Sequence, residues 1–282
     1  MILITGAAGK TGQAVLQALV KRGQAVRVMV RREGQTAVLT HQGAAETIVG
    51  DLENDDDVRR AMRGVRAVYH ICPNMHPDET GIGQRVIAAA RENSVAHVVY
   101  HSVLYPQIEA MPHHWHKLRV EEMLINSGLP FTILQPCAYM QNIGGQWPQI
   151  KASGVYRVPY RAETRLSLVD VADVGEAAAV ALTEPGHEQA IYPLCGHDAP
   201  TQTEVAQMLA AQMGRPVQVA VADQDKWQRQ AAANGLGAYR IETLLKMFAY
   251  YDQFDFVGNG KTLRWLLARP STRFVDYLAR LP

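Results

Sequence analysis

The chain has 282 residues, a formal net charge of +1, and 48% hydrophobic and 20% charged residues. This composition is typical of a globular protein with a full core in one or two domains. The near-neutral charge predicts no general attraction to nucleic acid or anionic membranes, and no apolar run is long enough to span a bilayer.

The first half of the chain alternates short apolar strands with amphipathic helices. We expect strands at residues 2–5, 25–30, 46–50, 66–71, 96–102 and 131–136. We expect helices near residues 10–22, 55–63, 79–93 and 114–127. This alternation predicts right-handed crossovers and a parallel sheet covered by helices on both faces.

The pattern loosens beyond Pro136. Residues 144–154 are rich in turn-forming residues, and residues 169–182 predict a helix. The tail from about residue 200 is mostly helical, with breaks at 214–216, 234–235 and 258–260. The fold class is therefore α/β, a Rossmann-type doubly wound parallel sheet with a smaller, mostly helical C-terminal cap.

The stretch "ILITGAAGKTGQAV" after the first residue fits two kinds of nucleotide loop. A P-loop needs a glycine five residues before Gly9, and that position is Ile4, so a triphosphate site is rejected. The alternative is a dinucleotide turn, in which Gly6 allows the sharp bend, Gly9 admits a pyrophosphate and Gly12 lets the helix approach the sheet. Lys10 and Thr11 then begin the helix whose N-terminus faces the anion. A purely structural turn would carry the same glycines.

The end of the second strand predicts which dinucleotide is bound. An NAD site usually has a carboxylate there, but this chain has Arg31 and Arg32, which suit a 2′-phosphate. Lys10 would add a further charge, and two solvated arginines remain an alternative. Asp51 and Leu52 follow the third strand as an acceptor and an apolar wall for adenine, unless Asp51 only caps a turn. We expect NADP(H) to be preferred over NAD(H).

Several segments in order resemble the NmrA-like branch of the atypical short-chain dehydrogenase/reductases. They are "ITGAAGKTG", "VRVMVRR", "GDL", "VVYHSV", "HKLRVEEMLINSGLPFTILQPCAYMQN" and "LVDVADVG", spanning about residues 1–185. The resemblance implies NADP(H) binding and one of two outcomes. Some members reduce quinones, dyes or aromatic compounds with NAD(P)H, and others bind the cofactor without turnover as redox-sensing regulators.

The catalytic signature of the wider superfamily, Tyr-x-x-x-Lys with an upstream Ser, is only partly present. Lys117 is in place, His113 stands four residues before it, and Ser102 is the candidate serine. His113 is either a replacement acid or a surface histidine at a helix start. Lys117 either lies near the nicotinamide ribose, as the family pattern implies, or pairs with Glu121 along the helix. His113, His114 and His116 lack the spacing of a metal site, so no metal is expected.

Two loops at the carboxyl end of the sheet are expected to line the nicotinamide and substrate pocket, because ligands of open parallel sheets bind there. After the sixth strand the candidates are Pro136, Tyr139, Met140 and Asn142, with core packing as the alternative for Tyr139 and Met140. After the fourth strand, Asn74 and Met75 are expected near the nicotinamide, whereas Cys72 and Pro73 are expected to pass over the adenosine and pyrophosphate. Cys72 lacks a base that would make it a nucleophile.

We therefore expect an NADP-binding Rossmann domain over residues 1–142, completed by part of 165–195, and a substrate and cap region over 143–282. The favoured function is an NADPH-dependent reductase acting on a small aromatic or quinone-like substrate by hydride transfer. The alternative is an NADP(H)-sensing regulator that acts through a partner protein, and an epimerase ranks below both.

The setting expected is cytoplasmic. Cys72, Cys137 and Cys195 are few and widely spaced, which suits a reducing compartment, and no signal peptide is evident. We expect no nucleic acid partner and no membrane contact. A homodimer is one open arrangement, and the substrate, the hydride face and the oligomeric state are left open.

Overall fold

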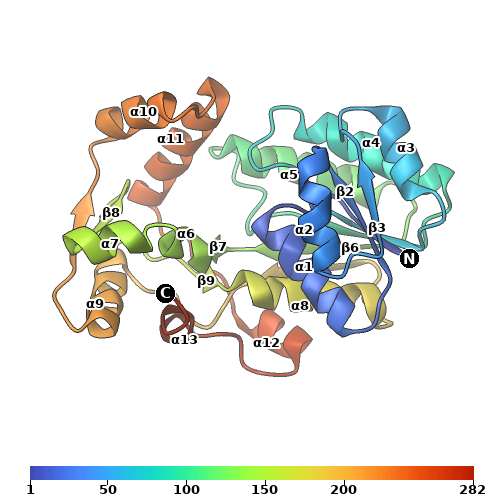
Figure 1. The fold of residues 1–282 in the computed structure, drawn as a ribbon. Helices are drawn as coiled ribbons and strands as arrows, with labels where there is room; N and C mark the ends of the chain where they lie inside the picture. The colour runs from blue at the N-terminus through green and yellow to red at the C-terminus, as the bar shows by residue number, and fades with distance from the viewer.

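The structure, a computed structural model, describes all residues 1–282, and a seven-stranded parallel sheet forms its centre (Figure 1). The sheet order is β10-β6-β5-β4-β1-β2-β3. Its strands are β1 (Ile2–Ile4), β2 (Val26–Val30), β3 (Glu46–Val49), β4 (Ala67–His70), β5 (His97–His101), β6 (Phe131–Pro136) and β10 (Ala190–Leu194). The order reverses beside β1, so β1 and β4 flank the crevice where ligands of such sheets bind.

Helices cover both faces of the sheet, as the alternating pattern predicts. One face carries α1 (Lys10–Lys21), α2 (Thr36–His41) and α8 (Val171–Thr183), and the other carries α3 (Asp55–Met62), α4 (Glu79–Glu92) and α5 (Pro112–Ile125). The short α2, preceded by a 3₁₀ turn at Glu33–Gln35, was not expected from the sequence. It is only six residues long, so its periodicity is too brief to detect.

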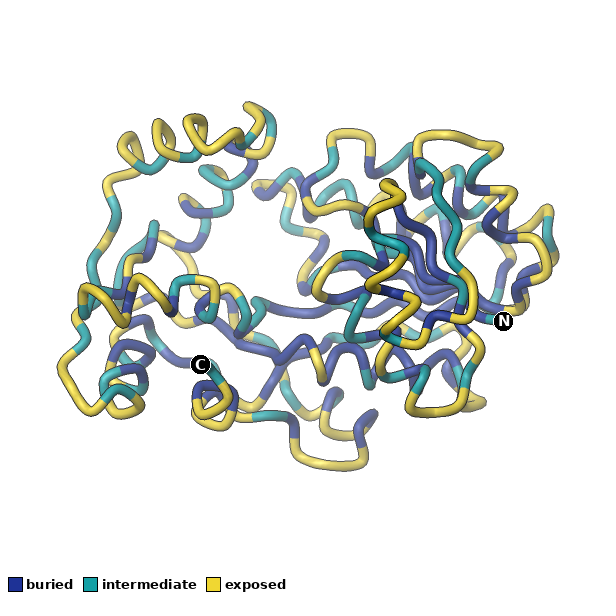
Figure 2. The backbone as a smooth tube through the Cα atoms, in the orientation of Figure 1, coloured by how far each residue is buried: buried dark blue, intermediate teal, exposed yellow.

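The buried strands explain why the sheet sequences are almost continuously apolar. In β1, Ile2 and Ile4 pack into the core on the α1 side, whereas Leu3 packs into the core on the α4 side. Because alternate strand residues point to opposite faces, a strand covered on both sides has no polar face. Figure 2 shows the sheet as the most continuously buried part of the chain.

The chain after β6 builds a second lobe around a separate apolar core. This lobe contains α6 (Met140–Gly144), α7 (Trp147–Ser153), α9 (Gln202–Met213), α10 (Gln224–Ala233) and α11 (Ala238–Gln253). Two small parallel ladders accompany them, β8 (Val155–Val158) with β11 (Gln218–Val221), and β7 (Ala138–Tyr139) with β9 (Leu168–Val169). Figure 1 shows α10 and α11 standing apart from the sheet as the outer wall of this lobe.

The last two helices pack away from α10 and α11, one against each lobe. Helix α12 (Lys261–Leu267) packs on α8 and β10, and α13 (Phe274–Leu278) packs on α9 and α6. The mostly helical tail therefore serves both lobes. No helix of the chain has the length and apolar character that crossing a bilayer requires.

Candidate cofactor and substrate cavity

The turn between β1 and α1 needs two of its three glycines for steric reasons. Gly6 has a φ of +61°, and a Cβ there would lie 2.8 Å from the carbonyl oxygen of Ile71. A Cβ at Gly12 would lie 2.6 Å from the Cα of Ala7. At Gly9 the nearest atom would be the Gly6 oxygen at 3.4 Å, an ordinary contact. The fold itself therefore requires Gly6 and Gly12, whereas Gly9 leaves open space beside the helix N-terminus.

One large cavity of about 1670 Å³ opens at the carboxyl end of the sheet and extends into the cap lobe. It brings together most residues that the sequence proposes for the site. Those lining it are Gly6, Gly9, Lys10, Thr11, Arg31, Asp51, Leu52, Cys72, Pro73, His113, Lys117, Pro136 and Tyr139. Gly12 and Arg32 do not line it: Gly12 packs under the turn, and Arg32 is exposed beyond the end of β2.

Arg31 and Asp51 form one end of the cavity. The Arg31 Nε lies 3.3 Å from an Asp51 carboxylate oxygen, and the Arg31 side chain is 75% exposed. The other Asp51 oxygen accepts a hydrogen bond from the Glu53 N–H at 3.1 Å. Asp51 therefore caps a turn in this structure, as the alternative interpretation of its sequence position expected. Leu52 is buried beside them. An exposed ion pair of this kind is worth little, so Arg31 is available to a more strongly charged partner.

Lys117 does not pair with Glu121, and that alternative is wrong. Its Nζ lies 2.6 Å from Glu79 Oε1 of α4 and donates to the His101 carbonyl at 3.2 Å. Glu121 points instead towards β5 and β6, where it accepts hydrogen bonds from Ser102 and Gln135. Burial raises the pKa of Glu121, and the bond from Ser102 opposes that shift. The Ser102 hydroxyl is thus occupied, while Lys117 borders the cavity with its charge paired.

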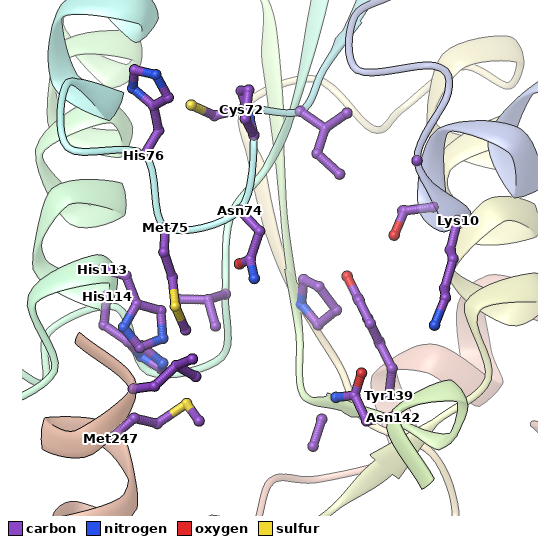
Figure 3. Close-up of a pocket in the computed structure, with 18 of the residues that line it drawn as sticks. Lys10, Cys72, Asn74, Met75, His76, His113, His114, Tyr139, Asn142 and Met247 are labelled. Atoms are coloured by element: carbon purple, nitrogen blue, oxygen red, sulfur yellow. The ribbon is translucent and has the colours of Figure 1, made fainter. Parts of the chain in front are cut away.

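His113 is buried, so its interpretation as a surface histidine is wrong. Only 7% of the residue is exposed, and its Nδ1 has no hydrogen-bond partner. Desolvation, and then the neighbouring His114 and Lys117, lower the pKa of His113 to about 2. Figure 3 shows His113 and His114 gathered with Met75 and Met247, on the wall opposite Tyr139. His113 is neutral at pH 7 because of this apolar setting and cannot act as a cationic acid there.

A histidine that sequence reasoning passed over also lines the cavity. His101 ends β5, one residue before Ser102, and bonds the hydroxyls of Tyr69 and Tyr139 at 2.5 and 2.7 Å. Burial, and then Lys117, lower the pKa of His101 well below its ordinary value. Its position at the carboxyl end of a strand could have marked it as a candidate, because ligands of parallel sheets bind at that edge. Its partners could not be seen, because they come from two other strands.

The cap lobe supplies an aromatic wall at the far end of the cavity. Its members are Tyr160, Trp227, Phe248, Tyr251 and Phe256. The rings of Trp227 and Phe248 meet edge to face at 4.9 Å between centroids, and those of Tyr251 and Phe256 lie 5.2 Å apart. Asn142, Asn74 and Met75 also line the cavity as expected, whereas Met140 is fully buried in the core of the cap.

The fold and this cavity define a Rossmann-type protein with a dinucleotide turn at one end of a shared cavity and an aromatic cap at the other. The model of the NmrA-like family matches residues 1–273. The chain belongs to the NmrA-like family, which confirms the resemblance seen in its sequence.

Two sequence relatives and one solved structure are similar to this chain. An NAD(P)H azoreductase of Xenophilus azovorans is 27% identical over 282 residues, or 98% of this chain and 96% of the relative. A (4-alkanoyl-5-oxo-2,5-dihydrofuran-3-yl)methyl phosphate reductase of Streptomyces griseus is 34% identical, over 77% of this chain and 75% of the relative. The crystal structure of the NADPH-dependent quinone oxidoreductase of Escherichia coli with NADPH has a TM-score of 0.88 and 25% identity, covering 100% of this chain and 99% of that chain.

Proposed function

We propose that this protein is an NADPH-dependent reductase of a quinone, an azo dye or another conjugated aromatic acceptor. The observation that carries the proposal is the single cavity running from the glycine turn to the aromatic wall of the cap. Its volume of about 1670 Å³ exceeds the roughly 300–1,000 Å³ of an ordinary ligand pocket, so a cofactor and an acceptor have room together. The azoreductase and quinone oxidoreductase among its relatives support this choice.

The N-terminus of α1 fits a pyrophosphate. No side chain caps this helix, and its first turn carries no acidic residue, so its free amides are open to an anion. The open space at Gly9 lets the anion approach the backbone. We assign Gly6, Gly9, Lys10 and Thr11 to the pyrophosphate and leave Gly12 to the packing of the helix.

The preference for NADPH is proposed from Arg31. Its guanidinium is largely exposed at the cavity, where it pairs only with Asp51. A 2′-phosphate would offer it a more strongly charged, bidentate partner than one carboxylate. Arg32 does not line the cavity, so Arg31 alone is proposed to bind the 2′-phosphate. Leu52, Cys72 and Pro73 would border the nucleoside.

The nicotinamide end is assigned to the region around Lys117, Pro136 and Tyr139. When bound there, reduced nicotinamide supplies a hydride, which is a proton and two electrons, to the acceptor. Lys117, held in place by Glu79, is positioned to hold the ribose. The aromatic wall and the flexible thioethers of Met75 and Met247 suit a flat apolar acceptor.

The test is NADPH oxidation followed at 340 nm against a panel of quinones, azo dyes and aromatic aldehydes. We expect turnover with at least one conjugated acceptor and slow or no turnover with simple aldehydes. Tight NADPH binding without turnover of any acceptor would contradict the proposal. That result would favour the redox-sensing regulator instead.

A further inference from the structure

The hydroxyl of Tyr69 decides where the protons lie in the buried chain Tyr69–His101–Tyr139. Tyr69 is fully buried, and its only hydrogen-bond partner is the Nδ1 of His101 at 2.5 Å. A buried hydroxyl that gives up its donor role is costly, and no other acceptor is within reach. Tyr69 therefore donates its proton to Nδ1, which must be the unprotonated nitrogen of the ring.

The tautomer of His101 follows from this bond. Burial and the Lys117 charge lower the pKa of His101 well below its ordinary value, so the ring is neutral and carries one proton. With Nδ1 accepting from Tyr69, that proton lies on Nε2. Nε2 is 2.7 Å from the Tyr139 hydroxyl and so donates to the Tyr139 oxygen.

Tyr139 is thereby left with a hydroxyl proton that no protein acceptor holds. Its oxygen accepts from His101, and the structure shows no second hydrogen bond at this hydroxyl. The nearby Thr11 side chain lowers the Tyr139 pKa. Desolvation is the larger influence and raises the Tyr139 pKa, so the phenol keeps its proton at neutral pH. Tyr139 lines the cavity, and Figure 3 shows it reaching into the space opposite Met75.

We propose that Tyr139 is the hydrogen-bond donor to the acceptor substrate, and that His101 and Tyr69 are positioning residues that force this direction of donation. The inference rests on the proposed reductase function. It also defines a substrate class, namely a conjugated acceptor with a carbonyl oxygen or azo nitrogen next to the atom that takes the hydride.

The donated bond strengthens as charge develops on that oxygen or nitrogen. For a quinone, hydride addition would break the nicotinamide C–H bond, form a C–H bond at the carbonyl carbon and move the carbonyl electron pair onto its oxygen, which becomes anionic. Tyr139 stabilises this oxygen by hydrogen bonding while keeping its own proton. Water in the open cavity then protonates the anion. Loss of the added ring hydrogen as a proton to water, with protonation of the opposite oxygen, gives the hydroquinone, so the only co-reactants are NADPH and water.

The proton position is tested directly by nitrogen-15 NMR of histidine-labelled protein with NADP⁺, with His101→Gln to assign the signals. We expect His101 to be neutral and protonated at Nε2. In Tyr69→Phe the constraint is removed, and we expect the Nδ1-protonated form to become populated. A ring protonated at Nδ1 in the parent protein would overturn the inference whether or not the protein turns over an acceptor.

The donor role is tested by Tyr139→Phe with two acceptors of different chemistry. One is 1,4-naphthoquinone, which develops charge on oxygen, and the other is malachite green, a triarylmethyl cation that takes hydride on carbon and needs no donor. Loss of one such donor typically costs about a hundred-fold in kcat. We expect that loss with the quinone, little change with the dye, and a several-fold loss with the quinone in Tyr69→Phe.

The matched control is Tyr192→Phe, which removes another tyrosine hydroxyl bonded to a histidine, His187, but outside the cavity. It should leave both rates unchanged. Parent-like quinone turnover in Tyr139→Phe would overturn the donor role, and so would an equal loss with the dye. If the parent turns over neither these two acceptors nor any other of the panel, the proposed function fails while the NMR measurement still decides the direction of donation.

Discussion

Arg31 lies at the end of β2 with its guanidinium open to the cavity, and Arg32 beside it does not line the cavity. Loss of a hydrogen bond to a charged group costs about 1.5–3 kcal/mol. Arg31→Ala should therefore weaken NADPH binding about ten- to a hundred-fold and leave NADH binding little changed. Calorimetric titration with both cofactors measures this, and Arg32→Ala is the neighbouring control. Equal affinities of the parent protein for NADPH and NADH would contradict the prediction.

Substitutions at the glycines of the β1–α1 turn should distinguish an effect on cofactor binding from an effect on folding stability. A methyl group at Gly9 meets only an ordinary contact in the protein but fills the space assigned to the pyrophosphate. Gly9→Ala should abolish NADPH binding with a small change in Tm. Gly12→Ala should lower Tm much more, because its Cβ would lie 2.6 Å from both the Ala7 Cα and the Gly6 oxygen. Thermal melts with and without NADPH distinguish the two, and equal losses of Tm would show that Gly9 also has a structural role.

Helices α4 and α5 are joined by the ion pair of Glu79 and Lys117, whose side chains are 1% and 11% exposed. Lys117→Met would leave the Glu79 carboxylate buried without its counter-ion, which typically costs about 3–5 kcal/mol of unfolding free energy. Urea denaturation of the parent and the variant measures the deficit.

The double variant Glu79→Gln with Lys117→Met provides the control for this pair. It removes both charges, so it should recover much of the lost stability. A double variant that is as unstable as Lys117→Met would show that packing, rather than the unpaired charge, is responsible.

The whole molecule buries several neutral histidines around the cavity, and this predicts sensitivity to acid. Desolvation lowers the pKa of His70 to about 3, of His113 to about 2 and of His114 to about 4. The unfolded chain takes up protons below its ordinary histidine pKa of 6.5, whereas the folded protein does not. The stability that these groups contribute is therefore complete above pH 6.5 and is lost as the pH falls towards the folded pKa values.

His113→Phe should make the protein less sensitive to acid. Each histidine still neutral in the folded state at pH 5 accounts for about 2 kcal/mol of lost unfolding free energy between pH 6.5 and 5. The loss measured by denaturation at pH 7 and 5 should shrink by about that amount in His113→Phe and be unchanged in His41→Asn, an exposed control. The kcat for a quinone at pH 7 should change little, because His113 is neutral. A hundred-fold fall in kcat would instead assign proton donation to it.

The positions of the strands and of the glycine turn were predictable because they depend on local pattern. The runs 2–5, 25–30 and 131–136 contain the strands observed, since continuous Val and Ile residues are needed where a strand is buried on both faces. The carboxyl ends of parallel strands meet at one edge, so the residues that follow them, such as Arg31, Asp51 and Pro136, were expected to share one cavity, and they do.

Side-chain partners were decided only by the tertiary structure. Sequence spacing suggested that Lys117 pairs with Glu121, but the approach of α4 offers it Glu79, and β6 offers Glu121 the amide of Gln135. Likewise, the start of a helix suggested an exposed His113, whereas the residue is only 7% exposed in the folded chain. The sequence by itself determined the sheet, the dinucleotide turn and the family, because these depend on residues close together in the chain. The Tyr69–His101–Tyr139 chain and the proton direction inferred from it depend on residues from separate strands, and only the assembled sheet brings them within hydrogen-bond distance.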